Sequence, residues 1–262
     1  MLIINADDFG KDALTNRAII SAFEKGLCSS TTIMPGASGF EEACRLAHER
    51  KLIDRIGAHL ALDGSYPLTE KIRYHSKLCD KNGRLCLGRL NTFDRFFLML
   101  GVGEKTSLAE EIRAQIRKCR ACGIPLTHID SHHHIHTAWA VASIVIRIAK
   151  EEGIHFIRLA RNLGPDSNAL KKIYKHIFNR RLKMLHMAAT DYFCSIDDIP
   201  EVKRRAGISS IVRSCEIMVH PRFNERNILV EESSGLELEP LVRQIDAYKD
   251  ARGYGGGKVS FK

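Results

Sequence analysis

The sequence lacks any run of apolar residues that approaches the roughly 20 needed to cross a membrane, so we expect no membrane span. Its first eight residues, Met-Leu-Ile-Ile-Asn-Ala-Asp-Asp, include no basic residue, which argues against a signal peptide. The eight cysteines are scattered among apolar positions instead of forming a dense framework, as is typical of reduced thiols. Together these absences favour a cytoplasmic protein.

Several motifs of common enzymes are also missing. No Gly-x-Gly-x-x-Gly sequence follows the first apolar run, so dinucleotide binding has no support. No Gly-x-Ser-x-Gly nucleophile elbow is present. Cys119 and Cys122 have the spacing of a redox or zinc pair, but the chain has no second pair and these two residues fall at the end of an expected helix. We therefore assign them no function.

The net charge of +9 and the isoelectric point near 9.2 raise the question of nucleic-acid binding. The clearest basic stretch matches no common nucleic-acid motif and carries only Tyr174 and Phe178 as interleaved aromatic residues. We interpret it as a solvated helix face and expect no nucleic-acid partner, while attraction of anionic substrates or membrane surfaces stays open. The stretch contains Lys171, Lys172, Lys175, Arg180, Arg181 and Lys183.

Short β-branched runs alternate with amphipathic helical stretches, the pattern of βα units around a parallel sheet. About seven repeats without a break in composition predict one α/β domain over residues 1–262, folded as a distorted (β/α) barrel like a TIM barrel. An open doubly wound sheet is the structural alternative. The expected strands are Leu2–Ala6, Ser30–Met34, Ile56–Leu62, Leu126–Ser131, His155–Leu159, Thr190–Ser195 and Glu216–His220. The expected helices are about 14–26, 38–51, 107–122, 138–152, 169–184, 198–208 and 236–252.

The segment from about Asp63 to Lys105 interrupts this alternation. Asn82-Gly83 lies between apolar flanks and predicts a tight hairpin, and an aromatic helix with Phe93, Phe96 and Phe97 is expected after it. The insertion directly follows the strand that carries His59. We interpret it as a lid or substrate wall, with a packing appendage or a subunit contact in a homo-oligomer as the alternative.

Residues 127–136 hold five of the twelve histidines, together with an aspartate. Imidazole is the commonest metal ligand and titrates near neutral pH, so the cluster indicates a metal site or proton-transfer chemistry. A tag or a metal-scavenging tract is disfavoured because the run is internal and flanked by isoleucines. Residues two apart share one face of an extended strand. That face would carry His128, Asp130, His132, His134 and His136.

Active sites of barrels and open parallel sheets collect at the carboxyl ends of the strands. Asp7 and Asp8 follow the first expected strand, His59 lies in the third, Arg158 in the fifth, and His220 ends the last. Adjacent carboxylates repel each other unless a cation lies nearby. One Asp with two His makes a ligand set that leaves positions open for water and substrate. These residues therefore predict a catalytic metal site.

Histidines that bind a metal need partners that fix their rings. Asp130 and His128 are placed to hold such histidines, and His134 and His136 are further candidates for this supporting role or for substrate contact.

At this point the chain resembles a known family, the YdjC-like carbohydrate deacetylases, of which chitooligosaccharide deacetylase is the best-defined member. The matching motifs follow one another in order over essentially the whole chain. They are Asn-Ala-Asp-Asp-Phe-Gly at 5–10, Ser-Thr-Thr at 30–32, Gly-x-His-Leu at 57–60, Thr-His-Ile-Asp-Ser-His-His-His-Ile-His at 127–136 and Val-His-Pro at 219–221.

The resemblance implies one divalent metal ion held by Asp8, His59 and His132 inside a distorted barrel. By similarity to the wider polysaccharide deacetylases, Asp7 is expected to be the general base and His220 the general acid. The family is described with Mg²⁺, whereas two imidazoles and a carboxylate also suit Zn²⁺.

Arg158 resembles an arginine that orients the general base. The implied reaction is the metal-dependent removal of acetyl groups from N-acetylated sugars, and the expected partner is a small carbohydrate such as an N-acetylglucosamine oligosaccharide. Two alternatives stay open, namely a metal-dependent phosphoesterase on a similar barrel and a metal-stabilised protein that binds sugar or nucleic acid without catalysis.

Overall fold

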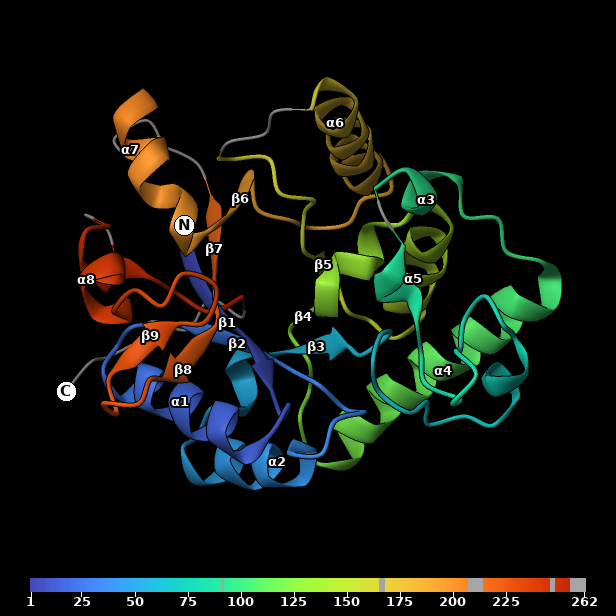
Figure 1. Ribbon diagram of the computed structural model, residues 1–262, viewed down its shortest axis with the longest axis horizontal. Helices are drawn as coiled ribbons and strands as arrows, with labels where there is room; N and C mark the ends of the chain where they lie inside the picture. The colour runs from blue at the N-terminus through green and yellow to red at the C-terminus, as the bar shows by residue number, and fades with distance from the viewer. Residues whose placement is uncertain (91, 165–167, 207–213, 246–247, 255–262) are drawn as a thin grey trace.

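The computed structural model describes residues 1–90, 92–164, 168–206, 214–245 and 248–254 (Figure 1). Seven parallel strands form one sheet in the order β5-β4-β3-β2-β1-β7-β6. The strands are β1 (Leu2–Phe9), β2 (Ser30–Ile33), β3 (Ile56–Leu60), β4 (His128–Ser131), β5 (Phe156–Ile157), β6 (Tyr192–Ser195) and β7 (Cys215–Val219). Because β5 and β6 end this order, the sheet is a curled half-barrel, and the predicted barrel-like α/β fold is confirmed.

β1 is an interior strand of the sheet, and its sequence explains that position. The run Leu-Ile-Ile-Asn-Ala-Asp-Asp-Phe is buried from its second residue onward, as expected for a parallel strand covered on both faces. β1 pairs with β2 on one side and with β7 on the other, where Ala6 lies opposite Val219. This register brings the carboxyl ends of the first and last parallel strands to the same edge.

Helices cover the outside of the curled sheet (Figure 1). α1 begins where the Asp12 side chain accepts a hydrogen bond from the Thr15 backbone NH at 2.8 Å, which is an N-cap. Gly26 follows that helix with φ of +69°, a conformation that glycine adopts without strain. The helices are α1 (Ala13–Glu24), α2 (Phe40–Glu49), α3 (Thr92–Phe97), α4 (Val102–Ala121), α5 (Trp139–Glu151), α6 (Ala169–Met184), α7 (Ile199–Ala206) and α8 (Leu238–Arg243).

One helix prediction is changed near the carboxyl-terminal end of the chain. The helix expected over 236–252 ends at Arg243, and a single 3-10 turn follows at Tyr248–Asp250. The last two residues of the helix expected over 198–208 lie outside the described residues. The sequence analysis also missed an antiparallel pair, β8 (Pro221–Phe223) and β9 (Leu229–Glu231), because strands of three residues are too short to show an alternating pattern.

The insertion contains the predicted turn at Asn82-Gly83. The Gly83 backbone NH donates to Asp80 O at 2.9 Å, and isolated antiparallel bridges join Cys79 to Leu85 and Asp63 to Cys86. The aromatic helix is α3, although the Phe93 side chain lies outside the described part. Within the described residues, no helix has both the length and the apolar character needed to cross a membrane.

Candidate metal centre and active site

The end of β1 carries two neighbouring carboxylates that reach different partners. Asp8 has φ of +73°, in the left-handed region that few residues other than glycine adopt, and the β1–β2 register is irregular between Ala6 and Phe9. Non-glycine residues in this conformation cluster at functional sites. The irregular backbone separates the side chains of Asp7 and Asp8, so each serves a different part of the site.

Asp8, His59 and His132 converge from the ends of β1, β3 and β4. Asp8 Oδ1 lies 3.1 Å from His59 Nε2 and 2.9 Å from His132 Nδ1. One ligand atom from each residue falls within 4.8 Å of the others, so the three could hold a metal ion together. These are the ligands that the family resemblance implies.

The surroundings of His59 favour a positive charge within this cluster. His59 Nδ1 lies 2.7 Å from Asp130 Oδ1, and a carboxylate only accepts hydrogen bonds, so Nδ1 carries the proton. In a neutral ring, Nε2 is then an acceptor, and it faces the Asp8 carboxylate, which is another acceptor. A metal ion held by both groups would remove this conflict, as in other sites where a carboxylate orients a histidine ligand.

The pKa values of His59 and Asp8 are shifted in the directions expected for a site that holds a positive charge. Burial lowers the pKa of His59, but the Asp130 carboxylate outweighs burial and raises that pKa to about 10, so a proton fills the place of the cation. Burial would raise the pKa of Asp8, but hydrogen bonds from His132 and His59 hold it well below its usual range. Lys11 Nζ lies 3.1 Å from Asp8 Oδ2, which leaves Oδ1 as the oxygen directed at the histidines.

Arg158 is fully buried and joins three carboxylates. Its Nη1 and Nη2 donate to Asp7 at 2.6 and 2.7 Å, Nη1 also lies 2.5 Å from Asp130 Oδ2, and Nε donates to Glu216 at 2.7 Å. Asp7, His59 and Asp130 form a second possible set of metal ligands. The guanidinium already supplies the positive charge between Asp7 and Asp130, so this second set is poorly suited to another cation.

His220 lines the same cavity as the candidate metal ligands. Its Nε2 is 4.0 Å from Asp7 Oδ2, and its Nδ1 is 3.2 Å from Glu231 Oε1. Burial lowers the pKa of His220, but the hydrogen bond with Glu231 and the charge of Asp7 raise it to about 9. These contacts therefore favour the protonated form of the imidazole at neutral pH.

The histidine run is not a single strand, so the prediction of one continuous ligand face is wrong. β4 ends at Ser131, and residues 132–137 form a tight turn in which His133 and His134 have φ of +54° and +55°. Alternation therefore applies only to His128 and Asp130. The turn directs His132 toward Asp8, while His133 is exposed with its Nδ1 3.1 Å from Asp63 of the insertion.

Three histidines of the run are not part of the three-ligand cluster. His128 is buried and stacks on the Tyr254 ring with centroids 3.7 Å apart, and burial lowers its pKa to about 3. His136 contacts Ser131 Oγ at 2.8 Å through Nδ1 and supports the turn from within. His134 lines the same cavity as His132, and its buried Nδ1 has no hydrogen-bond partner among the described residues. Asp130, one of the residues expected to support the metal ligands, contacts the candidate ligand His59 directly.

The sequence analysis did not identify several residues that shape this site. Glu231 comes from the missed β8–β9 hairpin. Glu216 is a lone acid in the apolar strand β7, a signal that was available, and burial raises its pKa to about 7. Tyr254 donates its hydroxyl to Glu216, and Thr32 Oγ1 contacts both His59 and Asp130.

A cavity of about 400 Å³ opens over the cluster. It is lined by Asp7, Asp8, Lys11, His59, Ser131, His132, His133, His134, His220, Glu232 and Ser233. An adjoining cavity of about 500 Å³ shares His134 with it and extends toward α6, with Arg95, Arg161, Lys171, Tyr174 and Lys175 on its walls. The candidate ligands, the Asp7–His220 pair and an open cavity therefore lie together at the carboxyl edge of the sheet.

A curled parallel sheet with a candidate Asp–His–His ligand set and an Asp–His pair at its carboxyl edge is the arrangement of a barrel-type enzyme. Comparison with known proteins gives the family. The family model described as "YdjC-like protein" matches residues 1–250. The chain belongs to the YdjC-like family.

Curated relatives carry related names. The chain is 30% identical over 250 residues to a carbohydrate deacetylase of Clostridium beijerinckii, covering 94% of this chain and 89% of that protein. It is 37% identical over 150 residues to a carbohydrate deacetylase of Brevibacillus brevis, and this match spans only 57% of the chain and 56% of the relative. A chitooligosaccharide deacetylase of Yersinia pestis is 34% identical over 157 residues, and this match covers 59% of the chain and 57% of the relative.

A solved structure supports the fold. It is an Enterococcus faecalis protein proposed to cleave cellobiose phosphate, with a TM-score of 0.69, 22% identity and coverage of 97% of both chains.

Proposed function

We propose that this protein is a metal-dependent hydrolase that removes acetyl groups from N-acetylated sugars, with short oligosaccharides that contain N-acetylglucosamine as its substrates. The observation that carries the proposal is the placement of one ligand set and one Asp7–His220 pair on a single cavity. Membership of a family whose curated relatives are named carbohydrate deacetylases supports the same reaction.

Asp8, His59 and His132 are the proposed metal ligands, and their donor set fits a divalent ion. When bound, such an ion polarises the acetamide carbonyl and lowers the pKa of water at the site. The two imidazole nitrogens suit Zn²⁺, whereas the family resemblance favours Mg²⁺. Elemental analysis of protein purified without added metal distinguishes the two ions.

Asp7 is the proposed general base. Arg158 and Asn5 hold its carboxylate from the strand side, with Asn5 Nδ2 donating at 2.8 Å, so the side chain has a fixed orientation toward the cavity. It removes a proton from the attacking water, whose oxygen forms a bond to the acetamide carbon. Fixed geometry of this kind supplies much of the rate enhancement in hydrolases.

His220 is the proposed general acid. Its proton passes to the departing sugar nitrogen as the carbon–nitrogen bond breaks, so the products are acetate and a free amine. Glu231 keeps the imidazole protonated before this step, because it raises the pKa of His220 to about 9. Without the proton, an amine anion would have to leave, and the reaction would stop.

Both alternatives have less support than deacetylation, the phosphoesterase for the following reason. Many such enzymes place two metal ions about 3.5–4 Å apart, whereas here Arg158 lies against both carboxylates of the second candidate set. A protein that only binds sugar would leave the Asp7–His220 pair without a role.

Replacing Asp7 by Asn tests the proposed base. The variant should keep the metal ligands and the bound metal, yet lose about 10² to 10⁴-fold in turnover, the range typical of one acid–base group. Asp54→Asn, at an exposed position before β3, is the matched control and should keep normal turnover. Near-normal turnover of Asp7→Asn would remove Asp7 from the role of base.

The insertion is the proposed wall of the substrate cleft, within the single domain. Arg95 Nη1 donates to His133 O at 2.9 Å, and Asp63 contacts the His133 ring, so this segment touches the turn that carries His132. If it contacts sugar, Arg95→Ala should raise KM for longer oligosaccharides more than for shorter ones. Cytoplasmic location is part of the same proposal, and the eight cysteines, none of them in a disulfide, support it.

A further inference from the structure

The outward face of α6 is apolar although it is exposed. Leu170, Ile173, Ile177 and Met184 have exposed fractions of 76%, 56%, 43% and 73%. Their spacing places them along one side of the helix, while Phe178 and the other buried residues face the interior. Burial in the core therefore does not explain this stripe.

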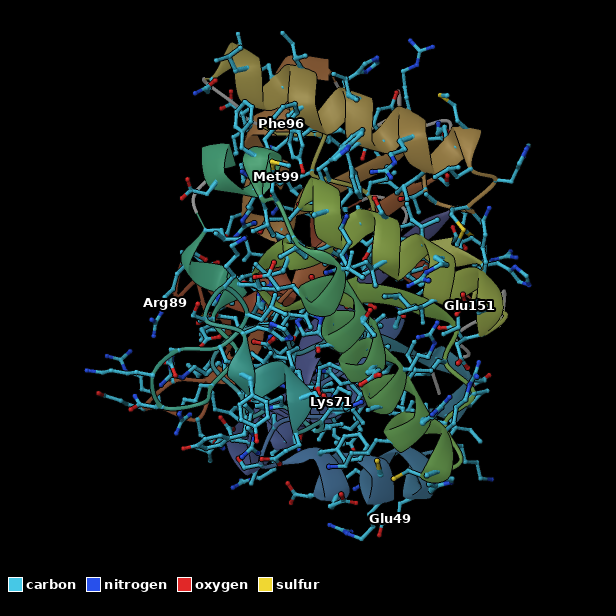
Figure 2. All side chains as sticks on the ribbon, turned by 90° about the vertical axis from the view of Figure 1, so that its right-hand side faces the viewer. Glu49, Lys71, Arg89, Phe96, Met99 and Glu151 are labelled. Carbon is cyan, nitrogen blue, oxygen red and sulfur yellow. The ribbon has the colours of Figure 1, made fainter. Side chains whose placement is uncertain are left out.

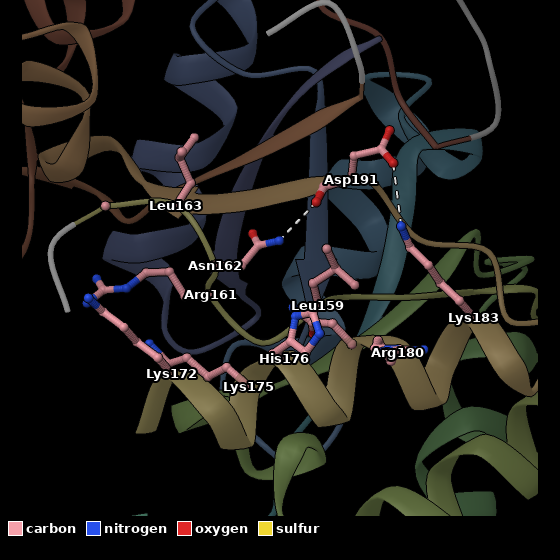
Figure 3. Close-up of a pocket in the computed structure, with 12 residues that line it drawn as sticks. Leu159, Arg161, Asn162, Leu163, Lys172, Lys175, His176, Arg180, Lys183 and Asp191 are labelled. Carbon is pink, nitrogen blue, oxygen red and sulfur yellow. Dashed lines mark hydrogen bonds and ion pairs between the residues drawn. The ribbon is translucent and has the colours of Figure 1, made fainter. Parts of the chain in front are cut away.

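Basic residues border the apolar stripe. Lys172, His176, Arg180 and Lys183 line a cavity of about 410 Å³ between α6 and the segment before it, as Figure 3 shows. The helix carries six Lys or Arg residues and no Asp or Glu. Lysine and arginine beside an apolar stripe are typical of helices that lie in the surface of a lipid bilayer.

The exposed apolar surface continues beyond α6. The Phe96 ring lies 5.3 Å from the Tyr174 ring and 6.4 Å from Trp139, and Phe97 beside it is 57% exposed. Figure 2 shows Phe96 and Met99 in the segment beside α6. Trp139, Met99 and neighbouring residues also line an open cavity of about 590 Å³. We call the exposed faces of α6 and α3 with Met99 and Trp139 the α6 surface.

The positive charge and the exposed apolar residues of this surface together distinguish among its possible partners. Contiguous apolar patches are rarely left open on soluble monomers. A second copy placed with α6 against α6 would oppose two helices that each carry six positive charges. Nucleic acid would satisfy the charge but not the exposed leucine and isoleucines. A bilayer with anionic lipids satisfies both, because headgroups neutralise the basic border and acyl chains cover the apolar stripe.

We propose that the α6 surface docks the protein on lipid bilayers that contain anionic phospholipids. Lys171, Tyr174 and Lys175 of α6 also line the cavity that shares His134 with the cavity over the metal-ligand set. Docking would therefore place the active-site cleft next to the headgroups. The cleft would then act on N-acetylated sugars carried by membrane lipids, an inference that rests on the proposed function.

Vesicle flotation tests docking directly with the whole protein. Vesicles of phosphatidylcholine with about a third phosphatidylglycerol should carry the protein to the top of the gradient, and vesicles of phosphatidylcholine alone should not. Ile173→Glu combined with Ile177→Glu should abolish flotation. Leu14→Glu on α1, at a residue 70% exposed, is the matched control and should float like the unchanged protein.

The basic border is tested separately. Lys172→Glu with Arg180→Glu should weaken vesicle binding by at least about 25-fold, because one basic residue near an anionic surface contributes about fivefold. Arg17→Glu on α1, combined with Lys25→Glu directly after α1, should change binding much less. Added salt should weaken binding of the unchanged protein.

Three results would overturn the docking proposal. The first is no flotation with anionic vesicles, and the second is a stable dimer that the Ile173→Glu and Ile177→Glu pair dissociates. The third is binding of duplex DNA as tight as vesicle binding and unaffected by that pair. Acetate release from a soluble oligosaccharide is an independent measurement. A protein that floats but releases no acetate refutes the proposed function alone, and one that releases acetate but never floats refutes docking alone.

Discussion

Replacing Glu231 by Gln tests how His220 is kept protonated. Glu231 Oε1 lies 3.2 Å from His220 Nδ1, and this contact is the largest cause that raises the pKa of His220 to about 9 from an ordinary value of 6.5. Glutamine has nearly the same shape and no charge. Because Asp7 still raises the pKa in the variant, we expect a value of about 7, a shift within the range that one nearby charge produces.

The effect on turnover follows from the fraction of protonated His220. At pH 8 that fraction falls from about 90% to about 10%, so kcat/KM should fall roughly tenfold. At pH 6 both proteins are mostly protonated and should differ little. The assay is the pH profile of kcat/KM for acetate release, whose basic limb should move from near pH 9 to near pH 7.

Glu225→Gln, an exposed change in the loop between β8 and β9, is the matched control and should leave the profile unchanged. An unmoved basic limb in Glu231→Gln, with the protein folded and its metal bound, would refute the argument that Glu231 sets the proton affinity of a catalytic His220.

Three further predictions concern the metal, the buried charges and the packing. His132→Ala should weaken metal binding by more than about 100-fold, measured by dialysis and elemental analysis, because losing even a residue that supports a ligand typically costs 10–100-fold. Arg158→Met should lower the free energy of unfolding in urea by about 3–5 kcal/mol, since it leaves buried carboxylates without their cation; an unchanged midpoint would contradict this. Gly57→Ala should lower stability by about 1–3 kcal/mol, because its Cβ would lie 2.5 Å from the His128 ring. Adding His128→Ala should reduce the cost of Gly57→Ala, and thermal melts would show whether it does.

The sequence indicated the positions of the main site residues because each follows a recognisable strand. Asp7 and Asp8 end the apolar run of β1, and His59 lies in β3. Parallel strands bring such residues to one edge whatever the details of the loops. This rule holds for His132 as well, since it directly follows β4.

The residues that set the chemistry of this edge were harder to predict. Glu231 reaches His220 only because β8 and β9 fold back as a hairpin of two three-residue strands. The turn after Ser131 depends on two left-handed residues, His133 and His134, which no residue preference indicates. Tyr254 meets Glu216 across 38 positions of sequence, a contact that only the packed fold defines.

The central claim is tested most directly by acetate release from a panel of N-acetylglucosamine oligomers, with metal-stripped protein to which Mg²⁺ or Zn²⁺ is returned. We predict that one of these ions restores release and that His132→Ala shows none under the same conditions. Release that needs no metal, or that survives in His132→Ala, would contradict the metal-centred account. No acetate release from any of the sugars, together with hydrolysis of a phosphodiester, would contradict deacetylation itself.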